Sequence, residues 1–486
     1  MGKWGYLLLA WASAALFAAC TAARGIAPTA MPTPTPSATA FAPATNTPIP
    51  PTATPTPTPS PTPTPLPRAR YTLHADLDYW GRLLKVDEVI HYPNTSPHAL
   101  QTLVLNVEHP QGLTIDQASV DDQPLTPHLQ GTRWEIPLPT PLPPQATLTL
   151  HVHLRQHLPL KTASHIFGAD ARQINLVEWY PFVVPYDAEQ GWQWHKPWPF
   201  GDHLAYPAAD FDVVLQVHHA PEGVMVAASA PPDPDGHYRL SAARAFAFSL
   251  SPVFQTATSQ VGEITVTSYY FADLAAGGRA LPSYAQKAVA TFLRRYGALP
   301  RRQLSIVATE AADGMEYSGL VFLSANFYRN YNGTPLDNLV SLGMHELSHQ
   351  WWYDQVGNDQ ALHPWLDEAL ATYSEYVFYE DNFPQVAPRW WNFRVLWFHP
   401  TGKINQSIYA FPTFRPYVNA TYLRGALFMR DLRARVGDEA FFAFLADYLA
   451  RGRGRLVGPQ DFFRVLEKHT NASYQDLLQN YFTPPP

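Results

Sequence analysis

Residues 345–352 read His-Glu-Leu-Ser-His-Gln-Trp-Trp and constrain this chain more than any other stretch. His345 and His349 stand four positions apart, and on an α-helix that spacing stacks both imidazoles on one face, close enough to share one metal ion. Glu346 follows the first histidine directly, where its carboxylate can accept a proton from a water held by the metal. The stretch therefore predicts a helix that carries two metal ligands and a general base.

A catalytic zinc ion needs three protein ligands and one position open to water. Glu368 offers the third ligand from a segment that follows Pro364, a residue well suited to start a helix. It comes 19 positions after His349, enough for one helix to end and a second to cross back. We expect His345, His349 and Glu368 to bind one Zn²⁺. The histidines could instead cap or pack in a helix, and Glu368 could be a solvated helix carboxylate, an alternative that needs two coincidences.

The composition limits the partners that the chain can have. Its 486 residues are 46% hydrophobic, so the chain can bury more than one core. A net charge of −7 offers no basic surface, so we expect no nucleic acid partner. The single cysteine, Cys20, rules out an intramolecular disulfide.

The first 20 residues resemble an export signal. Lys3 precedes an apolar run over residues 4–19, which ends in Leu-Phe-Ala-Ala before Cys20. This ending is similar to a bacterial lipobox, so we expect a lipid anchor on Cys20 and an exported, membrane-anchored lipoprotein on the extracytoplasmic side. Ordinary signal cleavage nearby and an uncleaved anchor helix are the alternatives.

Residues 21–68 are predicted to be a disordered linker rich in proline and threonine. Such a sequence cannot bury apolar surface, and repeated proline favours extended polyproline II. At about 3.1 Å per residue, this stalk would hold the folded part up to roughly 120 Å from its anchor.

In the rest of the chain, the sequence pattern changes once from strand-like to helical. Residues 69–271 carry short alternating runs broken by turns, such as 148–154, and predict an antiparallel β domain whose last strand is 264–270. From 272 to 486 helical patterns dominate. Strands followed by helices predict an α+β, multidomain fold.

An aromatic run over residues 178–198 lies inside the predicted β domain and admits two interpretations. It lines a ligand site or, as we favour, forms a loop packed against the neighbouring domain. His195 and His203 lack metal-ligand spacing and are expected to be exposed or hydrogen-bonded.

The metal motif and its neighbours resemble those of the gluzincin peptidases of the aminopeptidase N and leukotriene hydrolase type. Residues 349–352 are similar to the HQWF of that family, and residues 365–368 to its WLNE. The resemblance extends across residues 69–486. It implies an N-terminal β-sandwich or saddle domain packed on a mostly helical, thermolysin-like zinc peptidase domain, with one Zn²⁺ on the three ligands above.

The same resemblance assigns roles to further residues. Glu346 would be the general base, and Glu375 the carboxylate that orients a zinc-binding histidine. Tyr422 matches the tyrosine that stabilises the tetrahedral oxyanion, because a phenol donates a hydrogen bond where charge develops. Tyr417 stands where some members carry a further active-site tyrosine. The alternatives are a solvated helix residue for Glu375 and simple packing for the two tyrosines.

Residues 313–317 resemble the GxMEN segment of the family, whose glutamate binds the free α-amine of the substrate. Glu316 is that glutamate here, and Gly314 and Met315 would hold the peptide as an added strand. The first and last positions of the segment depart from the family pattern. Two weak candidates for a second amine ligand from the β domain are Gln173 and Glu178.

Together these residues predict a zinc-dependent aminopeptidase that hydrolyses N-terminal residues of peptides. The nearest alternative is an endopeptidase or oligopeptidase, which uses the same metal chemistry but does not cut after the first residue. A further alternative, from a different functional class, is a catalytically silent surface-binding lipoprotein.

Overall fold

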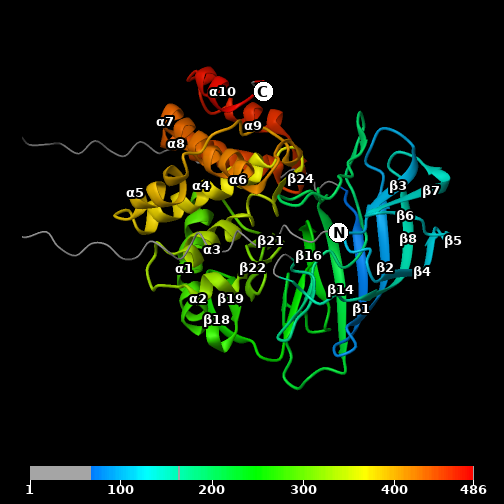
Figure 1. The fold of residues 1–486 in the computed structure, drawn as a ribbon. Coiled ribbons are helices and arrows are strands. Elements are labelled where there is room, and N and C mark those ends of the chain that lie inside the picture. Colours follow the sequence, from blue (N-terminus) through cyan, green and yellow to red (C-terminus); the bar gives the residue numbers. More distant parts are fainter. Residues whose placement is uncertain (1–66, 163–164, 485–486) are drawn as a thin grey trace, which may run out of the picture. The chain divides into compact units, whose positions relative to one another are not determined.

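The computed structural model describes residues 67–162 and 165–484, which belong to one compact unit. The predicted export signal, the lipid anchor on Cys20 and nearly all of the predicted linker lie outside these residues and stay predictions. Among the residues that are described, no helix is both long and apolar enough to cross a membrane. A β-rich half is followed by a helical half (Figure 1).

A seven-stranded sheet in the order β16-β14-β1-β2-β8-β4-β5 forms the largest part of the β half (Figure 1). Neighbouring strands are antiparallel except β1 and β14, which are parallel. Tyr71, Leu73, Ala75 and Leu77 of β1 are buried, whereas the residues that alternate with them are more exposed, the period-two alternation of a strand with one covered face. The strands are β1 (Arg70–Asp78), β2 (Leu83–Pro93), β4 (Leu113–Val120), β5 (Gln123–Pro124), β8 (Thr147–His157), β14 (Ala209–His218) and β16 (Tyr238–Ala243).

Smaller sheets complete the β half, and their buried side chains include Trp134, Trp179 and Phe246. One sheet contains β11 (Phe182–Val183), β3 (Leu100–Asn106), β7 (Arg133–Leu142) and β6 (Leu129–Gln130). Another contains β15 (Met225–Ala228), β17 (Phe248–Ser251), β10 (Ile174–Leu176) and β9 (Gly168–Ala169). A short hairpin pairs β12 (Tyr186–Asp187) with β13 (Gly191–Trp192).

A five-stranded sheet underlies the helical half. Its strands, in spatial order, are β18 (Gln255–Val261), β19 (Ile264–Tyr270), β20 (Gln303–Thr309), β22 (Leu320–Ser324) and β21 (Met315–Tyr317). The strand at 264–270 was predicted to close the β domain, but it pairs in parallel with β20. The strand therefore belongs to the five-stranded sheet, which alternation alone could not reveal because it identifies a strand without naming its partner. The predicted domain boundary between 271 and 272 stays a prediction.

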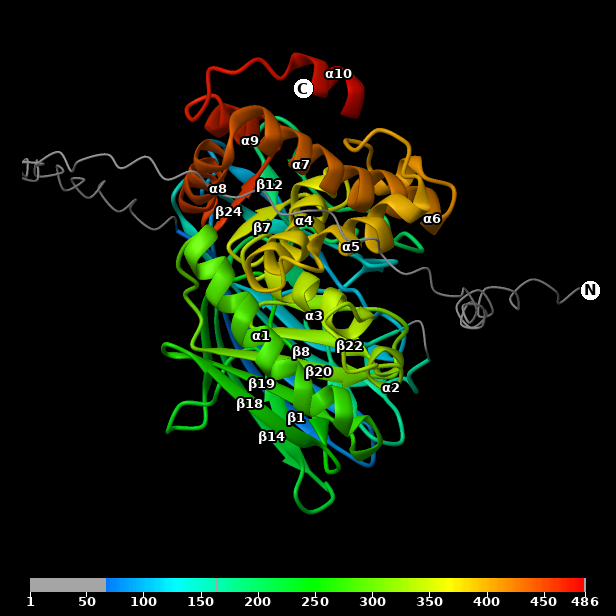
Figure 2. The same cartoon turned by 90° about the vertical axis from the view of Figure 1, so that its left-hand side faces the viewer.

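Helices cover this sheet and continue to the end of the described chain. Figure 2 shows α1 lying across β18 and β19. The α-helices are α1 (Ala275–Arg295), α2 (Ala325–Arg329), α3 (Asn338–Ser348), α4 (Trp365–Asn382), α5 (Ala387–Trp390), α6 (Phe414–Val418), α7 (Gly425–Val436), α8 (Asp438–Gly452), α9 (Pro459–Leu466) and α10 (Gln475–Tyr481). Other elements are η1 (Ala272–Leu274), η2 (Trp391–Val395), η3 (Leu396–Phe398), η4 (Ile408–Ala410), η5 (Asn419–Arg424), β23 (Val356–Asn358) and β24 (Arg455–Val457). The predicted α+β fold with two halves is confirmed.

The aromatic run contacts the helical half, in agreement with the interpretation that we favoured. The Tyr409 hydroxyl donates a hydrogen bond to the carbonyl oxygen of Lys196 at 2.7 Å. His195 Nε2 lies 2.7 Å from Asp359 Oδ2, whereas His203 pairs within the β half. Both histidines are thus engaged in hydrogen bonds.

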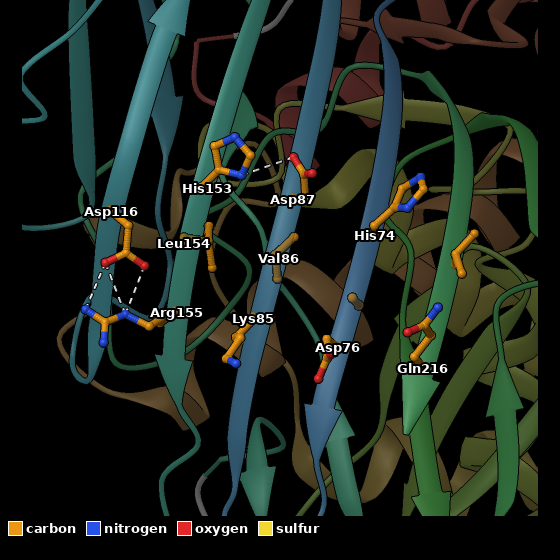
Figure 3. Close-up of a pocket in the computed structure, with 12 residues that line it drawn as sticks. His74, Asp76, Lys85, Val86, Asp87, Asp116, His153, Leu154, Arg155 and Gln216 are labelled. Atoms are coloured by element: carbon orange, nitrogen blue, oxygen red, sulfur yellow. Dashed lines mark hydrogen bonds and ion pairs between the residues drawn. The ribbon is translucent and has the colours of Figure 1, made fainter. Parts of the chain in front are cut away.

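The outer face of the seven-stranded sheet carries a shallow polar depression (Figure 3). No residue predicted to act in binding or catalysis lines it. Arg155 pairs with Asp116 at 2.8 Å, and His153 lies 3.4 Å from Asp87, so these charges neutralise one another. We assign no function to this depression.

Candidate active site

Helix α3 carries the predicted histidines and the predicted base. The Asp337 carboxylate caps its start by accepting a backbone N–H at 2.9 Å, the usual task of an aspartate at this position. His345 and Glu346 lie in the last turns, and His349 caps the end of the helix. All three side chains are buried.

Helix α4 brings the carboxylates. It begins directly after Pro364, as predicted, and places Glu368 in its first turn. Glu375 follows seven residues later, two turns along, and therefore on the same face as Glu368. Because α3 and α4 pack together, both carboxylates face the histidines.

The three predicted metal ligands form a compact triangle. His345 Nε2 lies 3.1 Å from Glu368 Oε2 and 3.3 Å from His349 Nε2, and the remaining side, from His349 Nε2 to Glu368 Oε2, is 3.7 Å. Nitrogen and oxygen ligands of a tetrahedral zinc, each at about 2.0–2.1 Å from the ion, stand roughly 3.3 Å apart. The triangle thus fits one zinc ion.

The other nitrogen of each imidazole is held by the protein. His345 Nδ1 donates to Glu375 Oε1 at 3.1 Å, and His349 Nδ1 donates to the Trp352 carbonyl oxygen at 2.9 Å. These bonds fix the tautomer and leave both Nε2 atoms facing the metal position. Burial lowers the pKa of His349 to about 4, so its imidazole is neutral, as a metal ligand must be.

Glu375 stays ionised despite complete burial. Burial by itself raises the pKa of this carboxyl, but the charge of Arg394 and the hydrogen bond with His345 bring the pKa down to about 2. Arg394 Nη2 donates to Glu375 Oε1 at 2.9 Å, and the Trp390 indole donates to Oε2 at 3.2 Å. The structure thus places Glu375 in contact with His345, one of the predicted zinc ligands.

We expect Glu375→Gln to bind zinc about 10–100-fold more weakly than the parent, because a neutral amide orients His345 less strongly than a carboxylate. Competition with a chelating zinc indicator measures the affinity. Glu467→Gln, an exposed change at the end of α9, is the matched control and should keep the parent value. Equal zinc affinity in Glu375→Gln and its control would contradict this role.

Glu346 faces the site beside Gly314. A Cβ added to Gly314 would lie 2.1 Å from Glu346 Oε1, so only glycine lets the carboxylate take this position. Burial raises the pKa of Glu346 well above its usual value. A carboxylate with a raised pKa is a better proton acceptor, which suits a general base.

The two predicted tyrosines also lie at the metal position. The Tyr422 hydroxyl donates to Glu368 Oε1 at 2.7 Å, and its ring stacks on His345. The buried Tyr417 ring meets that of Tyr422 edge-on, with centroids 5.5 Å apart. Burial raises the pKa of both hydroxyls, which keeps them protonated as hydrogen-bond donors.

Glu316 lies on the edge strand β21, one position after the half-buried Met315, and its carboxylate is buried. Gln360 Nε2 donates to Glu316 Oε1 at 3.1 Å, a partner that the sequence did not suggest. Burial and the nearby charge of Glu368 raise the pKa of Glu316 to about 8. Ligand atoms of Glu316, Glu346 and His349 all lie within 4.8 Å of one another, so this carboxylate adjoins the base.

The two weak candidates from the β half differ in their surroundings. The Gln173 amide donates to Ser249 Oγ at 3.1 Å and to a backbone carbonyl at 3.2 Å, contacts that occupy it in the packed interior. Glu178 accepts from the hydroxyl of Tyr317, the neighbour of Glu316, at 3.3 Å. Of the two, Glu178 is the one that faces the site.

Asp202, which sequence reasoning missed, contributes a half-buried carboxyl from the β half. Burial first, and then the charges of Glu316 and Glu368, raise its pKa well above the usual value, so it lies close to both. The adjacent Gly201 packs so tightly on Tyr417 that an added Cβ would lie 3.0 Å from its hydroxyl oxygen. No spacing rule connects position 202 with 316; the only sequence signal is a charged residue shortly after the aromatic run.

The helical half of the chain is similar in sequence to known peptidases. The model of the peptidase family M1 domain matches residues 287–481. Human aminopeptidase O is 26% identical over 236 residues, which are 39% of this chain and 28% of the relative. Rice aminopeptidase M1-C is 25% identical over 200 residues, which are 38% of this chain and 22% of the relative. The match thus spans only about a quarter of the length of these curated relatives.

A solved structure matches far more of the chain. An M1 zinc metallopeptidase from Deinococcus radiodurans is 21% identical, with a TM-score of 0.63 over 86% of this chain and 94% of that one. This likeness shows a shared fold that includes the β half. The ligand triangle and the family match agree on zinc as the cofactor. Residues 287–481 thus match the domain of peptidase family M1, and the chain is similar to the zinc metallopeptidases of that family.

Proposed function

We propose that the protein is a zinc aminopeptidase that removes single residues from the N-termini of peptides. The observation that carries this proposal is the position of Glu316, a buried carboxylate that adjoins the predicted base Glu346 and the metal ligand His349. A group that binds a free amine at this point sets where the peptide is cut.

The charges of the pocket favour a cation. The charge of Glu368 raises the pKa of Glu316, and the charges of Glu316 and Glu368 raise the pKa of Asp202, so these negative charges repel one another. An ammonium group relieves that repulsion and accepts the carboxylates as hydrogen-bond partners. We propose that Glu316 and Asp202 bind the α-ammonium group of the substrate, with Glu178 as a more distant negative charge.

The geometry sets the register of the cut. In a peptide, the N-terminal nitrogen and the carbonyl carbon of the same residue are only about 2.5 Å apart. An amine bound at Glu316 therefore leaves the first carbonyl group, and no later one, beside Glu346 and the metal ligands. The product is a single amino acid.

The chain's own residues divide the chemistry among them. Zinc, when bound to His345, His349 and Glu368, supplies a Lewis acid that makes water nucleophilic at neutral pH. Glu346 takes a proton from the attacking water, a C–O bond forms, and the Tyr422 hydroxyl donates a hydrogen bond to the oxyanion. Glu346 then passes the proton to the leaving nitrogen as the C–N bond breaks.

Similar proteins support a peptide substrate. The curated relatives above are named aminopeptidases. A variant of the Deinococcus radiodurans protein, 21% identical with a TM-score of 0.62, was solved bound to a Tyr-Ser-Ala substrate.

Blocking the substrate amine tests the proposal. We expect a free pentapeptide to be cleaved at least about 100-fold faster than its N-acetylated form, since the acetyl group removes the ammonium ion that Glu316 binds. Mass spectrometry of the products over time measures both rates. Internal cleavage of the acetylated peptide at a comparable rate would identify an endopeptidase instead.

Glu316→Gln separates amine binding from the metal chemistry. This variant should retain zinc, show a higher KM for the free peptide, and lose most of the preference for a free amine. Glu263→Gln, in the exposed turn between β18 and β19, is the control and should behave as the parent does. Unchanged preference for a free amine in Glu316→Gln would refute the assigned role.

A further inference from the structure

Large exposed apolar side chains gather in one part of the described chain. Eight such residues are at least 36% exposed, and five of them fall within residues 393–414. We call these five the apolar rim: Phe393, Leu396, Trp397, Phe398 and Phe414. Trp397 is the most exposed, at 71%. Scattered apolar residues on a surface are ordinary, whereas a gathered group indicates a binding surface.

The rim consists of two segments that lie against each other. Phe393 to Phe398 belong to η2 and η3, and Phe414 opens α6. The Arg415 guanidinium lies 4.8 Å from the centre of the Phe398 ring and so joins the segments through a cation–π contact. The two segments of the rim thus contact each other.

Both segments adjoin the proposed active site. Arg394, which follows Phe393, donates to Glu375, the partner of the zinc-binding His345. Phe414 meets the Tyr417 ring at 6.5 Å between centroids, and Tyr417 in turn contacts Tyr422. The rim therefore continues the wall of the site outward.

The direction of a bound peptide leads toward the rim. Strand β21 is the edge of its sheet, so an extended peptide can pair along it. With its amine at Glu316 and its first carbonyl beside Gly314 and Glu346, the peptide runs past Asp313. Arg394 of η2 lies near enough to Asp313 for its charge to act on that carboxyl, so we infer that the peptide leaves the site beside η2. At about 3.3 Å per extended residue, the third to fifth residues reach beyond the site.

We propose that the apolar rim binds apolar side chains at the third to fifth positions of the substrate, so that the enzyme selects peptides that are apolar downstream of the cut. This inference rests on the proposed aminopeptidase function and adds its substrate class. Two cations of the rim segments are engaged, since Arg394 pairs with Glu375 and Arg415 stacks on Phe398. An anionic lipid surface is therefore the less fitting occupant.

Two pentapeptides with the same N-terminal residue test the proposal, one continuing Ala-Leu-Phe-Gly and the other Ala-Ser-Gln-Gly. The parent should show a kcat/KM about tenfold higher for the apolar peptide. An aminoacyl 4-nitroanilide, too short to reach the rim, serves as the reference substrate. In Trp397→Ala, the ratio of kcat/KM for the apolar peptide to that for the anilide should fall severalfold, through KM.

Trp80→Ala is the matched control, because Trp80 is 69% exposed in the turn after β1, in the other half of the molecule. It should preserve the parent's ratio. Equal kcat/KM for the two peptides in the parent, or an unchanged ratio in Trp397→Ala, would overturn the proposal. So would loss of binding to phosphatidylcholine–phosphatidylglycerol vesicles in Trp397→Ala with no change in peptide preference, which would make the rim a membrane contact.

A different result would show that the proposed aminopeptidase function itself is wrong. If the parent hydrolyses neither the anilide nor the peptides, the aminopeptidase assignment fails. The rim is then tested by the equilibrium affinity of the zinc-loaded protein for the same two pentapeptides. A preference for the apolar peptide that Trp397→Ala removes supports the rim, and equal affinities overturn it.

Discussion

Glu346→Gln is expected to keep its zinc and to lose hydrolysis by a factor on the order of 10²–10⁴. Glutamine has nearly the shape of glutamate but no basic oxygen. Because Glu346 is assigned both proton transfers, toward the water and toward the leaving nitrogen, the loss should lie near the upper end of this range. Zinc should stay at one ion per chain, since the ligands are His345, His349 and Glu368.

Zinc content by plasma mass spectrometry and single-turnover rates on a free peptide measure the two parts of this prediction. The control is Glu439→Gln, an exposed change in the first turn of α8, which should match the parent in both. Parent-like hydrolysis by Glu346→Gln would remove the assigned base. A parent that binds zinc and cleaves no peptide would leave the silent binding protein as the better description.

The metal site was accessible to sequence reasoning because its geometry is encoded locally. A four-residue spacing on α3 fixes the two histidines relative to each other, and a seven-residue spacing on α4 does the same for Glu368 and Glu375. The structure adds the packing of the two helices, which closes the ligand triangle. The tyrosine and glutamate motifs were found only through the family resemblance.

Contacts between segments that are distant in the sequence could not be predicted from residue spacing. Asp202 approaches Glu316 and Glu368 because a loop of the β half reaches the helical half, and no pattern in the sequence encodes that approach. The sheet that contains the strand at 264–270 was mispredicted for the same reason. Period-two alternation reports which face of a strand is covered, but strand order depends on the whole fold.

A second large effect is expected at Arg244, which joins the β half to the loop after the metal-binding helix. Its guanidinium is buried and donates to the carbonyl oxygens of Tyr353, Asp354 and Gln355 at 3.1–3.2 Å. It also donates to the carbonyl oxygen of Arg455 at 2.8 Å. Burial lowers its pKa to about 10, which leaves it charged at neutral pH.

Arg244→Met should destabilise the fold by about 3 kcal/mol, because methionine fills the space and leaves several buried carbonyl oxygens without a donor. Part of that penalty is offset because a buried charge no longer has to be desolvated. The loop at 353–355 follows Trp352, whose carbonyl oxygen holds His349, so zinc affinity should fall as well. Thermal unfolding of the zinc-loaded protein and zinc titration measure the two effects.

Arg239 supplies an informative control because it lies only five residues away and contacts three carboxylates, those of Asp212, Asp233 and Asp235. These ion pairs are exposed, and exposed pairs contribute little to stability. Arg239→Met should therefore unfold at the temperature of the parent, although it removes three ion pairs. Arg244→Met, in contrast, removes only hydrogen bonds to carbonyl oxygens among the contacts described above. If the two variants unfolded at the same temperature, the hydrogen bonds from Arg244 to buried carbonyl oxygens would not be what stabilises the contact between the two halves.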